Sequence, residues 1–358
     1  MIPNQKTVEW LLQYAGSVIR YRTAREILNE KGENLEKLRI DLMSNLEVQI
    51  WLNNLKIEKP LKRNAIHGSL DNQFENAMLK VIQLGLHAGI PELDEIVEPF
   101  IEYLENESNK GDGKRKLFNS IIIASILLKA GYRTTPIIEF MKGSLHVMSS
   151  FAIQKSYDIY VANRNEYKGI PKNWSNTPII KPEIIEKNGF CYPMIYDLVG
   201  LSKMCLLEDN EVNKQVHSVI QYILTDDFHE NIIDGYGILF SGPGKYYSMG
   251  WDPKLPGYYD VSDSAKENPH KLLFVADIMS DYPVVVKSSW YIKVIHYLEQ
   301  FKTNSDDCTY CFPKEYLREK SGYGVQGFHL GLGENRRNKK WAEIESTFVM
   351  MRLKREMQ

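Results

Sequence analysis

Helix pairs recur along this chain, and their recurrence constrains the fold more than any other feature. Three predicted helices end on nearly the same residues: FIEYLE at 100–105, VIQYIL at 219–224 and VIHYLE at 294–299. Each of these is the second helix of a pair. The first helices are more apolar, which separates an inner layer from an outer one. The repetition predicts stacked pairs that bury their apolar faces against their neighbours.

The three-to-four spacing of apolar residues predicts where the helices lie. Pairs are expected over 65–106, 117–153, 191–228 and 269–301. Before them, the spacing predicts helices from Thr7, from Ser17 as an N-cap, and over Leu35 to Leu55.

The connections between pairs decide between two ways of stacking them. An open solenoid needs short, regular loops, whereas this chain has long ones at Gln154–Gly189 and Ile232–Pro269 and a glycine-rich one near Ser321–Gly333. We therefore predict an all-α protein, a double-layered α/α toroid of about five or six helix pairs over residues 61–358. An N-terminal helical extension over residues 1–60 precedes it.

The stretch Asp234–Asp260 has the composition of a long structured loop. Glycine and proline disfavour a helix there, and its many aromatic side chains suit a pocket wall. The SGPGK segment within it is predicted to be a turn, because it lacks the spacing of a phosphate-binding loop. The predicted ligand-binding aromatics, in this loop and in the nearby inner helix, are Tyr192, Tyr196, Tyr246, Tyr247, Trp251 and Tyr258. Packing of loops onto the helical core is the alternative role for them.

Charge and hydropathy exclude several classes of partner. The formal net charge is −2, so no basic field favours nucleic acid. No apolar run is long enough to span a membrane, and the N-terminal residues do not resemble a secretory signal. We expect a cytoplasmic protein with reduced cysteines and a small-molecule ligand.

Four side chains are the candidate catalytic acids or bases. His67 and Asp71 are spaced four apart with Glu75, which would align them on one face of a helix, although a polar helix face would give the same spacing. Asp197 and Asp252 each follow an aromatic residue. Asp252, the strongest candidate, also precedes Pro253, where it would otherwise cap a turn.

We predict no bound metal and no cofactor. Mg²⁺ is left open at the DDFHE motif, Asp226 to Glu230, which is expected at the end of a helix. Zn²⁺ is left open at Cys308 and Cys311, with His329 or Cys191 completing the ligand set. Neither motif is complete enough to favour the metal.

The segments GWDPKLPGYYD and GYGVQGFHLGLGENRRNKKWAEIESTFVMMRLKR, together with the helix pairs, resemble the α/α-toroid superfamily of terpene cyclases and prenyltransferases. The Asp-x-Asp-Asp motif of its protonating members is absent. The resemblance implies an enzyme that binds an isoprenoid-like or other largely apolar molecule in an aromatic cavity. His329 and Arg336 join the predicted ligand-binding residues, since arginines in the C-terminal segment can clamp a carboxylate or phosphate. A surface ion-pair network is the alternative there.

Two other functions fit the same residues. One is a carbohydrate-active toroid, a lyase or hydrolase; the other is a non-catalytic helical scaffold that binds a protein partner. For the enzyme, we predict that Tyr247, Trp251, Asp252 and Asp197 line one pocket with His67 and Asp71.

Overall fold

The chain is mostly helical, as predicted. The computed structural model describes residues 5–56, 65–107, 113–186, 189–207, 209–306, 308–355 and 357. Helices account for 61% of the described residues, about twice the usual share, and the sheets are small. Two compact units form: unit 1 is Met1–Asn106, Lys129–Tyr132 and Leu255–Gln358, and unit 2 is Glu107–Leu128 and Arg133–Lys254.

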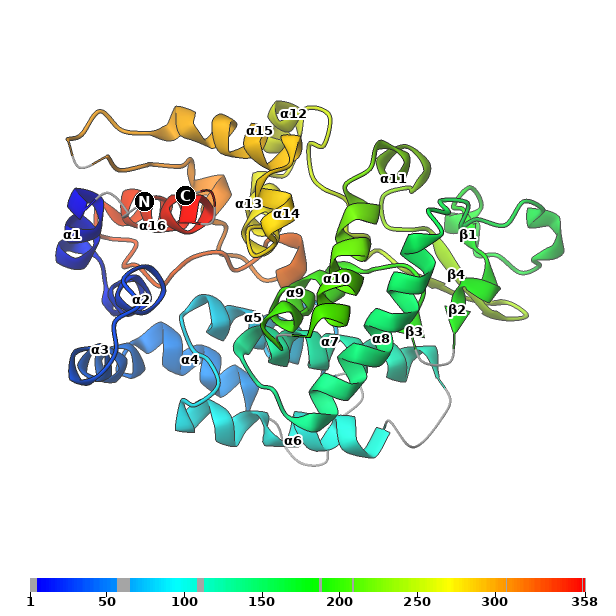
Figure 1. Ribbon diagram of the computed structural model, residues 1–358, viewed down its shortest axis with the longest axis horizontal. Coiled ribbons are helices and arrows are strands. Elements are labelled where there is room, and N and C mark those ends of the chain that lie inside the picture. Colours follow the sequence, from blue (N-terminus) through cyan, green and yellow to red (C-terminus); the bar gives the residue numbers. More distant parts are fainter. Residues whose placement is uncertain are drawn as a thin grey trace. The chain divides into compact units, whose positions relative to one another are not determined.

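Unit 1 combines the first and last helices of the described chain. In Figure 1 the blue helix α1 and the red helix α16 lie side by side, and both contact the π-helix η1. Their core includes Leu11, Ile19, Ile344 and Phe348. The helices of unit 1 are α1 (Gln5–Tyr14), α2 (Ser17–Arg22), η1 (Thr23–Ile27), α3 (Glu33–Met43), α4 (Leu46–Leu55), α5 (Phe74–Gln83), α6 (Pro91–Glu107, its last residue falling in unit 2), α12 (Val261–Glu267), α13 (Pro269–Met279), α14 (Pro283–Val286), α15 (Ser289–Leu298), η6 (Glu299–Phe301), η7 (Lys314–Leu317), η8 (Gly324–Gln326) and α16 (Trp341–Arg355).

Unit 2 packs helices beside a small sheet. Strand β1 pairs in parallel with β4, and β4 pairs in antiparallel fashion with β5. Helix α8 packs against α10, and the apolar run Ile121–Leu128 of α7 is buried. The elements of unit 2 are α7 (Lys114–Ala130, its last two residues in unit 1), α8 (Thr135–Ile153), η2 (Arg164–Glu166), η3 (Lys172–Trp174), β1 (Ile179–Ile180), η4 (Pro182–Ile184), β2 (Ile185–Glu186), β3 (Gly189–Phe190), α9 (Ile195–Met204), η5 (Cys205–Leu207), α10 (Asn210–Ile223), α11 (Asp226–Asn231), β4 (Ile238–Gly242) and β5 (Lys245–Ser248).

The first helices differ from the prediction in two details. The helix expected over Leu35 to Leu55 is two helices, α3 and α4, because the Asn45 side chain accepts a hydrogen bond from the Glu47 N–H and starts a new helix there. Gly16, not Ser17, is the N-cap of α2. Helices α1 and α2, within the predicted extension over residues 1–60, share a core with α16, and the domain boundary stays a prediction.

The stretch Asp234–Asp260 contains more regular structure than a loop. Strands β4 and β5 form a hairpin whose turn includes the glycine pair of SGPGK, and both glycines have positive φ. The turn is therefore confirmed, whereas the hairpin strands were not predicted. At the far end, the Asp260 side chain caps α12 by accepting from the Ser262 N–H.

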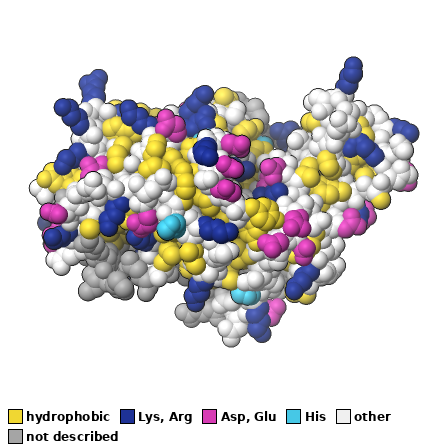
Figure 2. All heavy atoms as spheres, turned by 90° about the horizontal axis from the view of Figure 1, so that it is seen from above, with side chains coloured by type: hydrophobic (Ala, Val, Ile, Leu, Met, Phe, Trp, Pro, Cys, Tyr) yellow, Lys and Arg dark blue, Asp and Glu magenta, His cyan; other side chains and the backbone are white. Residues whose placement is uncertain are grey.

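The surface shows no field of one sign on the face that is drawn. Figure 2 shows basic and acidic side chains interspersed among the coloured atoms of that face, as a net charge near zero leads one to expect. Among the described residues, no single helix has the length and hydropathy to span a membrane, while α7 and α8 reach that threshold only together, as a pair bent by 116°.

Candidate functional site

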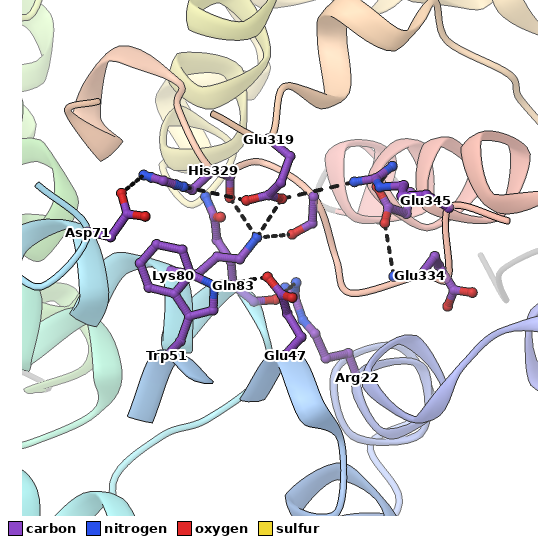
Figure 3. A network of polar contacts seen from close by, with 12 residues as sticks. Arg22, Glu47, Trp51, Asp71, Lys80, Gln83, Glu319, His329, Glu334 and Glu345 are labelled. Carbon is purple, nitrogen blue, oxygen red and sulfur yellow. Dashed lines mark hydrogen bonds and ion pairs between the residues drawn. The ribbon is translucent and has the colours of Figure 1, made fainter. Parts of the chain in front are cut away.

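A buried lysine lies at the centre of a polar cluster in unit 1. Lys80 lies on α5 with its side chain fully buried. Its ammonium donates to Glu319 Oε2 at 2.8 Å, to the His329 carbonyl at 3.1 Å and to the Gly331 carbonyl at 2.7 Å. Figure 3 shows these contacts converging on Nζ. All three N–H groups have acceptors, so the lysine fixes the segment that carries His329.

His329 lies between two carboxylates. Its Nε2 is 3.4 Å from Asp71 Oδ1, and its Nδ1 is 3.5 Å from Glu319 Oε1 (Figure 3). The imidazole is buried, and the Trp51 ring packs edge-on against it at 4.7 Å. The His329 backbone has φ of 62°, an uncommon conformation for a residue with a side chain.

The contact between Asp71 and His329 is longer than an ordinary hydrogen bond. Both His329 Nε2 and Asp71 Oδ1 are buried atoms without a hydrogen-bond partner among the described residues, although they face each other. A separation of 3.4 Å is long for a hydrogen bond, and catalytic hydrogen bonds often tighten only when a substrate is bound. Buried polar atoms in this condition are rare enough to need an explanation.

Glu319 has a lowered pKa. Burial acts to raise its pKa, but the hydrogen bond to His329 and the Lys80 charge outweigh burial and lower it. The side chain is about one-third exposed, at 34%. An ionised Glu319 favours a proton on the nearer nitrogen, Nδ1, which leaves Nε2 as the atom that can exchange a proton.

Arg336 joins the cluster through protein carboxylates. Its guanidinium is 3.3 Å from Glu345 Oε2 and 4.0 Å from Glu319 Oε2, and it stacks on the Trp341 ring at 3.7 Å. Burial raises the pKa of Glu345 to about 7 although Arg336 lowers it. Burial also raises the pKa of Glu334, which accepts a hydrogen bond from the Gly16 N–H. These contacts match the ion-pair alternative for Arg336.

A pocket of about 660 Å³ borders the cluster. Glu319 forms part of its wall, together with residues of α12, α13 and η7. The aromatic rings in the wall belong to Tyr297, Phe301 and Tyr316. A ligand in this pocket would therefore lie against apolar rings and contact a carboxylate that also touches His329.

The prediction that His67 and Asp71 share a helix with Glu75 is wrong, because only Glu75 lies in one. Helix α5 begins only at Phe74, because the Asn76 side chain donates to the Gly68 and Leu70 carbonyls and holds this segment in turns. His67 Nδ1 contacts the buried Glu75 carboxylate at 2.8 Å. Asp71 reaches His329 instead, so the structure joins one predicted catalytic residue with one predicted ligand-binding residue.

The two other predicted catalytic residues lie in unit 2. Asp197 is buried in the first turn of α9, where Oδ2 accepts from the Met194 N–H and Oδ1 has no partner among the described residues. Burial raises its pKa to about 7. Asp252 accepts from the Gly235 N–H at 2.7 Å and the Lys254 N–H at 3.0 Å, as the turn-cap alternative requires.

The predicted aromatic residues are dispersed. In unit 2, the rings of Tyr196 and Trp251 pack together at 5.6 Å, and Tyr192 is buried against Tyr236. The Tyr246 hydroxyl donates a hydrogen bond to the Lys168 carbonyl, whereas Tyr247 is half-exposed on β5. Tyr258 belongs to unit 1. The residues of the predicted common pocket are divided between the two units, and that pocket stays a prediction.

Sequence reasoning missed two central residues of the cluster, Lys80 and Glu319. A signal existed for Lys80, which interrupts an otherwise apolar stretch of α5. Glu319 lies in an irregular charged segment, where nothing in the local pattern distinguishes it from a solvated glutamate.

The metal motifs do not form ligand clusters in the part of the chain that the structure describes. No group of three or more His, Cys, Asp or Glu side chains there has the geometry to hold an ion. Cys308 and Cys311 are free thiols. Asp226 begins a short helix of its own, α11, capped by Thr225, so the motif does not end α10 as predicted.

Comparison with protein-family models, with curated proteins and with solved structures finds no match to this chain.

Proposed function

We propose that this protein is an enzyme whose acid–base group is His329 with Asp71 and Glu319. It would act on a largely apolar small molecule, isoprenoid-like in character, bound in the pocket beside Glu319. The observation that carries the proposal is the buried imidazole held between two carboxylates, with Nε2 and Asp71 Oδ1 facing each other unbonded. We propose the α/α toroid as the architecture for the helix pairs.

The cost of this arrangement supports a functional role. The histidine occupies a left-handed backbone conformation, which is unfavourable for most side chains. It also leaves two buried polar atoms unsatisfied, each of which costs about 1–3 kcal/mol. An apolar side chain in the same space would leave no unsatisfied imidazole nitrogen, although it would share the backbone penalty. Strain and unsatisfied groups of this kind concentrate at active sites.

The pocket wall supports an apolar substrate. Tyr297, Phe301 and Tyr316 present aromatic rings, and the volume of about 660 Å³ suits a small organic molecule. Glu319 connects this wall to His329. A ligand in the pocket would therefore contact the carboxylate that orients the His329 imidazole.

A carbohydrate-active enzyme is the second candidate. Asp71 and Glu319 are both partly exposed, at 40% and 34%, and approach opposite nitrogens of one imidazole. Two carboxyl groups near one reacting centre are the basic requirement of glycoside hydrolysis. The aromatic wall favours the apolar substrate but stacks equally well on a sugar ring.

The test separates His329 from an ordinary core histidine. Wild type, His329→Asn and the control His296→Asn, an exposed histidine of α15, are incubated with isoprenoid alcohols and with uronate oligosaccharides, and products are followed by mass spectrometry. Asparagine tolerates the left-handed conformation, so the backbone is kept. We expect one substrate set to turn over and His329→Asn to lower its rate by about a hundredfold or more. Turnover by His329→Asn equal to that of the control, or no turnover of either set by wild type, contradicts the proposal.

A further inference from the structure

The wall of the pocket beside Glu319 contains a cation that pairs with no carboxylate of the described residues. Arg318 lies in the pocket wall, and its guanidinium stacks on the Phe328 ring at 4.3 Å. Its hydrogen-bond partner is His270, at 3.0 Å from one guanidinium nitrogen. Among the described residues, no Asp or Glu oxygen lies within 4 Å of this guanidinium, in contrast to Arg22, Arg336 and Arg352.

The contact with His270 leaves the arginine charge intact. A guanidinium can only donate, so His270 Nε2 must accept and the imidazole must be neutral. Burial, assisted by the Arg318 charge, lowers the pKa of His270 to about 4, which agrees with a neutral ring. The pair therefore carries one full positive charge in the wall of the pocket.

The carboxylates of the pocket do not compensate that charge directly. Glu267 and Glu315 are exposed residues of the wall, and neither pairs with Arg318. The Glu319 carboxylate contacts Lys80 and His329 instead. Stacking on Phe328 and the bond to His270 hold the guanidinium in place before any ligand binds, which lowers the entropic cost of binding.

We infer that this pocket binds an organic acid: a molecule with an apolar body and one terminal oxyanion, a carboxylate or a phosphate. Arg318 would bind the oxyanion, because a planar fork of N–H donors matches two oxygens of such a group. The rings of Tyr297, Phe301 and Tyr316 would contact the apolar body. The inference rests on the proposed function only in placing the reacting end of the ligand beside Glu319. Binding of the ligand can be measured without turnover.

The test uses a fluorescent pair that differs in the anion. Anilinonaphthalene sulfonate has an apolar body and one oxyanion, and phenylnaphthylamine is its neutral counterpart. Each is titrated into wild type, Arg318→Met, Arg318→Lys and the control Arg337→Met, an exposed arginine of unit 1 whose side chain has no ion pair with the described residues. Decanoate and inorganic phosphate then compete with the bound sulfonate.

We expect Arg318→Met to weaken binding of the sulfonate about tenfold or more, Arg318→Lys to weaken it less, and Arg337→Met to leave it unchanged. The neutral probe should bind all four proteins alike. Decanoate should displace the sulfonate at concentrations where phosphate does not, which identifies a carboxylic acid with an apolar body as the ligand. Displacement by phosphate alone would assign the Arg318 site to free phosphate. That result would overturn the inference that the ligand has an apolar body.

Equal binding of the sulfonate by Arg318→Met and Arg337→Met, or no saturable binding to wild type, overturns the inference. Loss of packing in a variant would increase fluorescence of the sulfonate, the opposite of the expected change, so misfolding cannot imitate the result. A negative result in this binding experiment does not affect the His329 turnover experiment. If His329→Asn loses turnover but binds the sulfonate as wild type does, the catalytic proposal and the binding inference are shown to depend on different residues.

Discussion

Lys80 of unit 1 and Asp197 of unit 2 are buried ionisable groups with opposite surroundings. In unit 1, the Lys80 ammonium has three acceptors, and one of them is a carboxylate whose pKa lies below its usual value. In unit 2, the Asp197 carboxyl has one backbone donor, and burial raises its pKa to about 7. The difference shows that burial alone does not decide whether a group stays charged. At each site the hydrogen bonds and nearby charges compete with burial.

The largest loss of stability is expected for Lys80→Met. Methionine fills similar space but leaves Glu319 and two carbonyls without their donor, so unit 1 should lose about 3 kcal/mol of unfolding free energy. Urea unfolding followed by fluorescence measures it, since Trp51 lies beside Lys80. The control, Lys266→Met, removes an exposed pair with Asp263 and should change stability by less than about 0.5 kcal/mol.

A double variant sharpens this prediction. If Lys80 is needed mainly because Glu319 is charged, Glu319→Gln should recover part of the loss when combined with Lys80→Met. Strictly additive losses would show that the carbonyls of His329 and Gly331, rather than the carboxylate, account for the effect of Lys80.

Asp197→Asn tests the buried carboxyl of unit 2 through the pH dependence of the unfolding free energy. The folded pKa of about 7 lies above the ordinary 3.8, so the folded state binds the proton more tightly. The contribution of this group is fully present below about pH 4 and is lost as the pH rises through about 7, by up to about 4 kcal/mol. Asparagine cannot titrate. Relative to wild type, the variant should gain stability as the pH rises from 4 to 8 in thermal unfolding; a constant difference over that range would contradict the shifted pKa.

The helix contacts of unit 2 offer a matched pair of glycines. A Cβ at Gly200 of α9 would lie 2.8 Å from Ser125 Cα of α7, so Gly200→Ala should cost about 1–3 kcal/mol. Gly143 of α8 has open space at that position, and Gly143→Ala should stabilise by up to about 1 kcal/mol. Thermal unfolding of both variants measures the difference, and a neutral Gly200→Ala would mean that α7 and α9 pack less closely.

The smallest effect is expected for Asp252→Asn. The amide oxygen can replace only one of the two carboxylate acceptors, so the turn should lose about 1 kcal/mol. Turnover of the substrate found with His329→Asn should stay at the wild-type rate if Asp252 only caps the turn. A rate loss of tenfold or more would instead restore Asp252 as the catalytic residue that the sequence suggested.

The sequence predicted those features that depend on local spacing. The pairs α5–α6 and α7–α8 lie where the apolar periodicity placed them, because a buried helix face repeats every three to four residues. The same argument failed for His67 and Asp71, since a spacing of four describes a helix only where the chain is helical. The hairpin β4–β5 was missed because glycine and proline dominate its composition.

The candidate site could be predicted only in part. Asp71, His329 and Arg336 were selected by residue type, but their partners lie far away in the sequence: Lys80 and Glu319 are 239 positions apart. No periodicity connects such residues. Tertiary packing brings them together, and a single sequence holds no local signal of that contact.

The shared core of α1 and α16 has a consequence for the order in which the chain can fold during synthesis. Leu11 and Ile19 emerge from the ribosome long before Ile344 and Phe348, the residues that cover them. Unit 2, which lies between residues 107 and 254, is fully synthesised in the meantime. The apolar faces of α1 and α2 therefore stay uncovered until α16 has been synthesised. Exposed apolar surface of this kind favours binding by chaperones.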